Sequence, residues 1–458
     1  MEMFKLSFVL DSTKGSLISK SQDFYFSGVS TDSNRIKDGD LFVALKGNRF
    51  DGHDFVLEAL KNGAMGAIIE RQVSLKNNGK VIIKVQSTLN ALGDIAQAWK
   101  HHFHDLRVAA ITGSNGKTTT KEMASSILSL RNSVLKNSGN LNNLIGLPLS
   151  LLRLNGTHNA AVVELGMNEF GEIRRLADIT KPDIAAITNI GRAHLERLGN
   201  IEGVARAKGE LVEDFNKENV FVVNMDDPFV KKIADSVKCE KITYGINSKN
   251  VDLSAVDIIK EGFSGVRFSL GIKGEMVPVR LKGIGIHNIM NSLCAAGVAL
   301  SFGCVADEIK DGLERFVPVL MRLEVIDTPY GFRVINDAYN SNPESMRGAI
   351  EELMRLKENG RAVAVLGDML ELGDVSELEH KTLGQFLSEW GVDLVITLGR
   401  FGESVLDGFG KRERGIYLET HDEAAQFLVE YAKQGDLVLI KGSRGMKMEN
   451  IIQRLYLR

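Results

Sequence analysis

The sequence has little cysteine, no excess of one charge and no long apolar run. Its three cysteines, Cys239, Cys294 and Cys304, are widely spaced and form no C-x-x-C pair, so we expect buried free thiols in a reducing cytoplasm. Lys and Arg number 56 against 59 Asp and Glu, so the overall charge does not favour binding to nucleic acid or to an anionic membrane. No run approaches the ~18 apolar residues of a membrane span. The N-terminal residues also lack the apolar stretch of a signal peptide.

What the sequence does contain is typical of a globular protein with several domains. Its 458 residues exceed one typical core, and this length predicts about three domains. Hydrophobic residues make up 44% and charged residues 25%, as in ordinary globular proteins. The sequence has no internal repeat or low-complexity tract. Alternation over Met1–Phe8 predicts an N-terminal strand, and short strands and turns continue to about residue 85.

A glycine-bounded turn joins an apolar strand predicted over 107–112 to a helix predicted over 118–130. The turn, Gly113-Ser114-Asn115-Gly116-Lys117-Thr118, has the form G-x-x-G-K-T, and Ile111 stands where the longer pattern has a glycine. Such a loop directs backbone N–H groups and a helix N-terminus at an anion, while its lysine adds a positive charge and its threonine offers a hydroxyl to magnesium. The turn therefore predicts a nucleotide phosphate site and leaves the reaction open.

Strands and helices alternate from residue 107 onwards, which predicts a parallel sheet covered on both faces. Ligands of such sheets bind at the carboxyl ends of the strands. Glu164 follows the strand predicted at 161–163, and Asn189 and His194 follow the strand at 184–188. A carboxylate and an imidazole beside a triphosphate suit magnesium-assisted phosphoryl transfer. Singly, Glu164 could cap a helix and His194 could be an ordinary polar residue, but their predicted convergence favours the functional interpretation.

Three further regions carry polar residues whose role the pattern leaves open. Ser30–Ser33 and Gly39–Gly47, which includes Lys46, could bind a diphosphate or could form turns around a small sheet. Residues 242–281 alternate and predict a small antiparallel insertion. The helix that opens at Gly285–Asn291 carries polar residues on neighbouring turns, which helix capping would also explain.

A second doubly wound domain is predicted after Pro318. Its strands are expected at about 323–327, 332–337, 362–367, 394–399 and 437–441, with helices between them. Three loops, over 336–343, 367–373 and 441–444, leave strand ends on what should be one edge of the sheet. Each loop alone could be a simple turn with a helix cap. Because all three are expected at the same edge, the pattern favours a ligand site.

Together these motifs resemble the Mur ligases of bacterial cell-wall synthesis over essentially the whole chain. The resemblance rests on the short phosphate loop, on the motifs listed next, and on their order along the chain. These motifs are Thr31-Asp32-Ser33, Phe42–Gly47, Asn140-Leu141-Asn142-Asn143 with Gly146 and Pro148, Glu164, His194, Ala207–Glu210, Gly285–Asn291, Asp337–Pro343, and Gly367–Gly373 with His380. Two positions depart from the family pattern, because Asn34 precedes Arg35 after Ser33 and Leu144 replaces a common acidic residue.

The resemblance implies an α/β fold of three domains. They are a small UDP-sugar-binding domain over 1–85, a central ATP-binding domain over 86–317 with a parallel sheet and an antiparallel insertion, and a Rossmann-like doubly wound domain over 318–458 that binds the incoming dipeptide. The implied activity is ATP-dependent joining of D-alanyl-D-alanine to UDP-N-acetylmuramoyl-tripeptide through an acyl phosphate. Such an enzyme serves peptidoglycan synthesis, cell shape and division, as a cytoplasmic monomer whose partners are these substrates, without nucleic acid or membrane insertion.

The resemblance also assigns roles to individual residues. It implies catalytic roles for Lys117, Glu164, His194 and Lys208. It implies that ATP is bound by Gly113, Ser114, Asn115, Gly116, Lys117, Thr118, Thr119, His287, Asn288, Asn291, Arg322 and Asp337. It places Thr31, Asp32, Ser33, Lys46, Asn140, Asn142, Asn143, Tyr339, Asn340, Asp368 and Glu371 at the other substrates. Two magnesium ions are expected at Thr118, Glu164, His194 and a carbamylated Lys208, which from spacing alone would be a solvated lysine. Because Arg322 and Asp337 follow residue 318, the resemblance also implies domain closure.

Two other interpretations remain open from the sequence. A related ligase that adds the preceding diamino acid, or a folylpolyglutamate synthase, would share the phosphate loop and differ in the amine that it uses. A nucleotide-dependent switch that binds a partner protein would also carry the loop, but it would leave Glu164, His194 and the N-terminal motifs unexplained.

Overall fold

The computed structural model describes residues 4–18, 25–47, 49–73 and 80–456. The chain forms two compact units. The first comprises Met1–Ile111, Arg131–Met167 and Gly171–Ala185, and the second comprises Thr112–Leu130, Asn168–Phe170 and Ala186–Arg458. None of the described helices is long and apolar enough to cross a membrane. Cys239, Cys294 and Cys304 form no disulfide among the described residues, and Cys294 and Cys304 are buried as predicted, whereas Cys239 is half-buried.

The N-terminal part of the first unit contains a five-stranded sheet. Its order is β2 (Ser16–Leu17), β7 (Val81–Lys84), β6 (Gly66–Ile69), β5 (Leu41–Val43) and β4 (Val29–Ser30), with β2 antiparallel to β7 and the other pairs parallel. Helix α2 (Val56–Lys61) packs its apolar residues, with Phe42 and Ala67 among others, in a local core. A small sheet of β1 (Phe4–Lys5) and β3 (Tyr25–Phe26) lies in the same unit.

The predicted N-terminal strand is wrong beyond Lys5. Helix α1 (Leu6–Thr13) begins there and buries Leu6 and Val9, which are three residues apart and so share one helix face. Phe4 and Phe8 pack against Trp99 of helix α3 (Thr88–His101), with ring centroids 4.4 and 6.1 Å apart. A tertiary contact thus outweighs the local alternation. Met1–Met3 lie outside the described residues.

Nine strands form the central sheet, in the order β16-β15-β14-β13-β12-β11-β8-β10-β9. The parallel pairs include β9 (Val134–Lys136) with β10 (Ala160–Glu164), β10 with β8 (Arg107–Thr112), and β12 (Val220–Asn224) with β13 (Glu240–Gly245). Strand β14 (Leu253–Lys260) pairs in parallel with β13, and β15 (Val266–Ile272) and β16 (Glu275–Leu281) continue antiparallel. The antiparallel insertion is therefore confirmed for β14–β16, whereas residues 240–245 extend the parallel part. The remaining strand, β11, spans Ile184–Ile187.

The helices of this middle part of the chain follow the predicted alternation with the strands. They are α4 (Lys117–Leu128), α5 (Gly146–Leu151), α6 (Glu172–Thr180), α7 (Leu195–Leu198), α8 (Ile201–Gly209), α9 (Pro228–Ser236), α10 (Ile286–Ser301) and α11 (Ala306–Arg315). Asp227 caps α9 by accepting bonds from Phe229 N and Val230 N, and its other oxygen accepts from Ile190 N. The acidic residues after β12 are thus explained by capping and turn formation.

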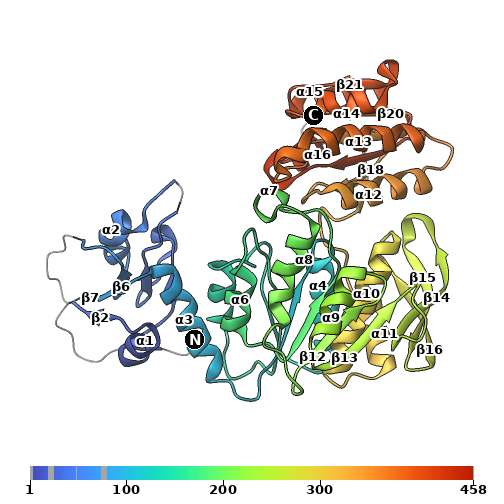
Figure 1. The fold of residues 1–458 in the computed structure, drawn as a ribbon. Coiled ribbons are helices and arrows are strands. Elements are labelled where there is room, and N and C mark those ends of the chain that lie inside the picture. Colours follow the sequence, from blue (N-terminus) through green and yellow to red (C-terminus); the bar gives the residue numbers. More distant parts are fainter. Residues whose placement is uncertain (1–3, 19–24, 48, 74–79, 457–458) are drawn as a thin grey trace. The chain divides into compact units, whose positions relative to one another are not determined.

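A six-stranded sheet forms the C-terminal part of the second unit (orange and red in Figure 1). Its order is β17 (Glu324–Asp327), β18 (Arg333–Asp337), β22 (Leu437–Lys441), β19 (Ala362–Leu366), β20 (Leu394–Thr397) and β21 (Gly415–Tyr417), parallel except for β17. The helices of this part are α12 (Pro343–Leu356), α13 (Ser376–Glu389), α14 (Gly402–Phe409), α15 (His421–Tyr431) and α16 (Glu449–Leu455). The predicted α/β class is confirmed, and the three-residue strand β21 is the one that the pattern missed.

Candidate active site

The phosphate loop runs from the end of β8 to the first residue of α4. Gly113 has φ 146° and Gly116 has φ 81°, conformations that glycine adopts without strain. A Cβ at Gly113 would lie 1.9 Å from Thr188 Oγ1, and one at Gly116 would lie 2.2 Å from Asn291 Oδ1. Both glycines are therefore required by conformation and by space. The loop leads into the N-terminus of α4, which begins at Lys117 and where backbone N–H groups can bind an anion.

Lys117 folds back over its own loop. Its Nζ donates to Gly113 O at 2.8 Å and to Ser114 O at 3.2 Å. These carbonyls hold the ammonium beside the backbone N–H groups at the start of α4, where an incoming phosphate would meet both. The geometry fits the nucleotide role predicted for Lys117.

Two residues after β11 hold the loop in shape. Thr188 Oγ1 donates to Asn115 O at 2.6 Å. Asn189 Oδ1 accepts from Asn115 N at 2.9 Å, and its Nδ2 donates to Asn115 O at 3.1 Å. Ser114 Oγ accepts from Gly191 N and donates to Gly191 O. Ser114 and Asn115, which were predicted to bind ATP, thus also anchor the loop, and Thr188 was not among the predicted residues.

Arg322 reaches the phosphate loop from the C-terminal part of the second unit. Its Nη2 donates to Thr118 Oγ1 at 3.1 Å, and its guanidinium lies 4.1 Å from the ring centroid of Tyr339. Its Nε is buried without a hydrogen-bond partner among the described residues. A buried N–H that no protein group satisfies, beside the predicted phosphate site, fits an anionic ligand. Thr119, the next residue of the loop, is buried.

Three residues of α10 were predicted near the adenine. Asn291 is buried next to Gly116 and accepts from Thr120 Oγ1 at 3.4 Å. Asn288 donates to Ile284 O at 2.7 Å, one turn earlier, so its amide is used within the helix. His287 is exposed. Asn288 thus has a local structural role, and contact of these three residues with adenine stays a prediction.

Glu164 and the asparagine-rich segment belong to the first unit. Glu164, at the end of β10, is 3% exposed, and its Oε1 accepts from Asn142 Nδ2 at 2.8 Å. Asn137 binds the backbone of Glu164 on both sides, through Glu164 N and Glu164 O. Asn143 Oδ1 accepts from Ile145 N and Gly146 N and so starts α5, while Asn140 is exposed. The prediction missed Asn137, which lies three residues before Asn140, directly after β9.

His194 and Lys208 lie in very different surroundings. His194 has φ 56° at the start of α7, and its Nδ1 lies 2.6 Å from Glu371 Oε2. His194 lowers the pKa of the Glu371 carboxyl, and this effect outweighs burial, which raises it. Lys208 in α8 is 1% exposed, so the interpretation of a solvated lysine is wrong. Among the described residues, no group of three His, Cys, Asp or Glu side chains could hold a metal ion, and the magnesium site stays a prediction.

The predicted UDP-sugar residues lie in the segments that follow β4 and β5 of the five-stranded sheet. Asp32 is exposed and caps a short 3-10 turn, in which its Oδ1 accepts from Asn34 N at 3.0 Å. Arg35, also exposed, lies 3.5 Å from Asp32 Oδ2. Thr31 is half-buried and Ser33 is buried. Lys46 is exposed and forms an isolated bridge with Asp51, so its ammonium is accessible to an anion.

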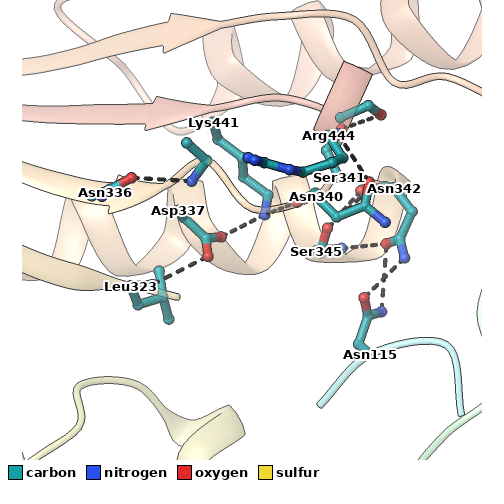
Figure 2. A network of polar contacts seen from close by, with 12 residues as sticks. Asn115, Leu323, Asn336, Asp337, Asn340, Ser341, Asn342, Ser345, Lys441 and Arg444 are labelled. Atoms are coloured by element: carbon teal, nitrogen blue, oxygen red, sulfur yellow. Dashed lines mark hydrogen bonds and ion pairs between the residues drawn. The ribbon is translucent and has the colours of Figure 1, made fainter. Parts of the chain in front are cut away.

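The loops after β18 and β22 form a polar network (Figure 2). Lys441 is 2% exposed, and its Nζ donates to Asp337 Oδ2 at 2.5 Å and to Asn340 O at 3.0 Å. Asp337 Oδ1 accepts from Leu323 N at 3.1 Å. Asp337 therefore has a charged partner that the sequence did not assign. Asn340 is exposed, and its Oδ1 accepts from Arg444 N at 3.4 Å.

The loop after β19 is ordered by a carboxylate and an imidazole. Asp368 is buried, and its two oxygens accept from Arg400 N at 2.8 Å and Phe401 N at 3.0 Å. Asp368 thus supports the loop, because both of its oxygens are used by the backbone. His380 Nε2 accepts from Met369 N at 2.9 Å, and its Nδ1 donates to Ser376 O at 2.6 Å. Glu371, with φ 65°, and Leu370 are exposed residues of this loop.

Within the second unit, the first turn of α12 contacts the phosphate loop and the segment after β11. The amides of Asn342 and Asn115 exchange two hydrogen bonds, of 2.9 and 3.4 Å (Figure 2). Arg192 Nε donates to Glu344 Oε1 at 2.9 Å, and its Nη1 donates to Glu379 Oε1 at 3.0 Å. The structure thus brings together a phosphate loop and strand-end loops more than two hundred residues apart. Arg192 gave no signal in the sequence.

Three family descriptions match successive parts of the chain: "Mur ligase family, catalytic domain" at residues 25–100, "Mur ligase middle domain" at 111–299, and "Mur ligase, glutamate ligase domain" at 321–444. The UDP-N-acetylmuramoyl-tripeptide–D-alanyl-D-alanine ligase of Bacillus subtilis is 38% identical over 434 residues, 93% of each chain. A crystal structure of MurF from Acinetobacter baumannii is similar with a TM-score of 0.91, at 35% identity and 99% coverage of both chains. A MurF ligase from Thermotoga maritima in complex with ADP has a TM-score of 0.83, at 30% identity, covering 93% of this chain and 96% of that one.

Proposed function

The chain belongs to the Mur ligase family, and from this premise we propose that it joins D-alanyl-D-alanine to UDP-N-acetylmuramoyl-tripeptide at the expense of ATP. It is an ATP-dependent ligase of peptidoglycan biosynthesis. The identity to the Bacillus subtilis ligase extends over the C-terminal loops that select the amine, and this favours D-alanyl-D-alanine over the diamino acid or the glutamate of related ligases.

The reaction needs ATP because a carboxylate has no leaving group. A carboxylate oxygen of the tripeptide attacks the γ-phosphorus and displaces ADP, which gives an acyl phosphate. The amine of the dipeptide then attacks the acyl carbon, phosphate leaves and the nitrogen loses a proton. The first step brings two anions together, so positive charge at the phosphates must offset their repulsion.

The chain supplies this charge from two directions. Lys117 holds its ammonium beside the N-terminus of α4, and Arg322 presents an unpartnered Nε next to Thr118. Gly113 and Gly116 let the backbone N–H groups approach the phosphates. His287 and Asn291 lie by the adenine in this assignment, and Asp337, held by Lys441, orients the nucleotide from the C-terminal side.

Oxygen donors of the chain fit two magnesium ions, which are hard cations. We assign to them the hydroxyl of Thr118, the carboxylate of Glu164, His194, and Lys208 as a carbamate. Lys208 is buried, and as a carbamate it would offer oxygen atoms, which hard cations prefer as ligands. Magnesium, when bound, neutralises phosphate charge. Asn142 holds the carboxylate of Glu164 in one orientation.

The remaining substrates divide between the ends of the chain. We assign the UDP moiety to residues 1–85, through Thr31, Asp32, Ser33 and Lys46. Residues 86–317 bind ATP, and residues 318–458 bind the dipeptide through Tyr339, Asn340 and Glu371, with Asp368 as support. We assign the tripeptide part of the substrate to Asn140, Asn142 and Asn143. The enzyme acts in the cytoplasm as a monomer.

One observation carries the proposal: within the second unit, Arg322 and Asn342 of the C-terminal part bind Thr118 and Asn115 of the phosphate loop. Nucleotide phosphates and amine-selecting loops therefore belong to one site. A nucleotide-dependent switch has no need of this arrangement.

The test is ADP release by the purified protein with ATP, magnesium and UDP-N-acetylmuramoyl-tripeptide, with and without D-alanyl-D-alanine. We expect sustained release only with both substrates, together with the pentapeptide product in the mass spectrum. Diaminopimelate, lysine and glutamate are offered in turn as competing amines. Lys117→Ala serves as the control, because loss of ADP release in this variant would show that the measured ADP comes from the phosphate-loop site. Equal release without a muramoyl substrate would support the switch instead.

A further inference from the structure

Strand β22 lies between β18 and β19, and its end anchors the loops on both sides. Lys441, the last residue of β22, pairs in register with Asp337 of β18 and with Leu366 of β19. Its carbonyl accepts from Gly367 N at 2.8 Å, while its ammonium binds Asp337 and Asn340 (Figure 2). The segment Lys441-Gly442-Ser443-Arg444 therefore contacts both loops of the proposed dipeptide site.

Ser443 connects these loops through one buried hydroxyl. It is 4% exposed, and its Oγ accepts from Leu370 N at 2.8 Å. The same Oγ lies 2.9 Å from Ser341 Oγ, and Ser341 Oγ donates to Asp368 O at 3.4 Å. Since Ser341 donates onward to Asp368, Ser443 is the donor to Ser341. The bonds then form a continuous chain from Leu370 N through both hydroxyls to Asp368 O.

The residues that flank this chain are those proposed to touch the dipeptide. Leu370 directly precedes Glu371, and Ser341 directly follows Asn340. The exposed side chains of Asn340 and Glu371 therefore stand on two loops whose relative position is set by Ser443. The bonds of Ser443 reach neither the phosphate loop nor the first unit, so the described contacts do not link it directly to the proposed ATP or UDP residues.

We propose that Ser443 is a positioning residue for the amine substrate: its hydroxyl fixes the loops after β18 and β19 at the spacing that binds the dipeptide. This inference rests on the proposed function, because it takes the amine to be D-alanyl-D-alanine. Without the hydroxyl, Leu370 N loses its acceptor and Ser341 loses a donor, so the two loops no longer share a fixed geometry.

The test compares Ser443→Ala with Ser443→Thr in steady-state kinetics of the full-length enzyme. For Ser443→Ala we expect KM for D-alanyl-D-alanine to rise about tenfold, which corresponds to ~1.4 kcal/mol. KM for UDP-N-acetylmuramoyl-tripeptide and for ATP should change less than about twofold. Ser443→Thr keeps a hydroxyl and should restore most of the dipeptide affinity. Ser341→Ala breaks the same chain from the other loop, and it replaces Ser443→Ala if that variant does not fold.

Thr397→Val is the matched control. Thr397 is fully buried at the end of β20, and its hydroxyl has no hydrogen-bond partner among the described residues, so its loss should leave all three KM values unchanged. An unchanged dipeptide KM in Ser443→Ala and Ser341→Ala would overturn the inference. An equal rise of all three KM values with a lower melting temperature would also overturn it, because it would show general destabilisation. A wild-type enzyme that ignores D-alanyl-D-alanine would instead refute the proposed function.

Discussion

Three fully buried lysines show how this protein treats a charge in its interior. Lys121 lies 3.1 Å from Glu122, and Lys441 lies 2.5 Å from Asp337. Lys208 is buried to the same degree in α8. An ion pair offsets the loss of hydration for the first two. Lys208 is the residue for which we propose carbamylation, which would convert the ammonium into an anion with oxygen atoms suited to magnesium.

Replacement of Lys208 tests this assignment. Lys208→Ala should lower the rate of ADP release at least ~100-fold, because a ligand of the phosphate-neutralising metal is lost. Added acetate or formate should restore part of the rate by supplying the missing carboxylate. Lys208→Arg is the control, since it keeps the positive charge and cannot be carbamylated. Wild-type activity in Lys208→Arg, or an intact protein without carbamate by mass spectrometry in bicarbonate, would contradict the role.

At the scale of elements, the loops at the strand ends are held by side chains that bind backbone groups. Asp368 binds two N–H groups of the segment after β20, and His380 of α13 binds Met369 N. Several polar residues of the loop region are therefore structural, and exposed neighbours such as Glu371 are the ones proposed to contact the substrate. A high density of polar residues in a loop predicts a ligand site. It does not distinguish residues that support the loop from residues that contact the substrate.

His380 makes the stability of this loop depend on pH. Burial lowers its pKa and outweighs the Ser376 carbonyl and the carboxylates of Asp368 and Glu379, which raise it. Because the folded state disfavours the protonated ring, the stabilisation is fully present above about pH 6.5, the ordinary pKa, and is lost as the pH falls through the lowered folded value. The melting temperature should therefore decrease as the pH is lowered from about 6.5. His380→Gln should show a weaker dependence, and identical pH profiles for the two proteins would exclude this cause.

At the scale of the whole molecule, ion pairs connect parts of the second unit that are distant in sequence. Arg192 follows β11, whereas its partners Glu344 and Glu379 lie on α12 and α13. The guanidinium is about one third exposed, so solvent screens part of the attraction. These contacts accompany the bond between Asn115 and Asn342, and they favour the arrangement in which phosphate loop and C-terminal loops meet.

Loss of these ion pairs should weaken catalysis without harming the local fold. Arg192→Gln is expected to lower kcat/KM for ATP about threefold to tenfold, and to reduce the sensitivity of the rate to added salt. Arg412→Gln is the matched control, because Arg412 pairs with Glu403 and Asp407, which belong to the C-terminal part itself. The measurement is ADP release from low to high ionic strength. If both variants respond to salt as the wild type does, Arg192 has no such role.

The sequence by itself determined the local chemistry. The phosphate loop, the strands that carry Glu164 and Asp337, and the five predicted C-terminal strands are set by apolar patterns and by glycines whose backbone angles other residues would strain. The family resemblance extended these local patterns to a reaction. Two short elements, β21 and helix α1, were not predicted, because the sequence pattern of β21 is weak and that of α1 is outweighed by packing.

Only the tertiary structure decided which side chains are partners. Burial of Lys208, the pairing of Lys441 with Asp337, the hydroxyl of Ser443 between two loops and the reach of Arg322 to Thr118 each join residues distant in sequence or depend on what surrounds them. Charge and hydrogen-bond complementarity act over a few ångströms in space, and spacing along the chain carries no record of them. Sequence thus determined which groups this enzyme has, and the fold decided which of them act together.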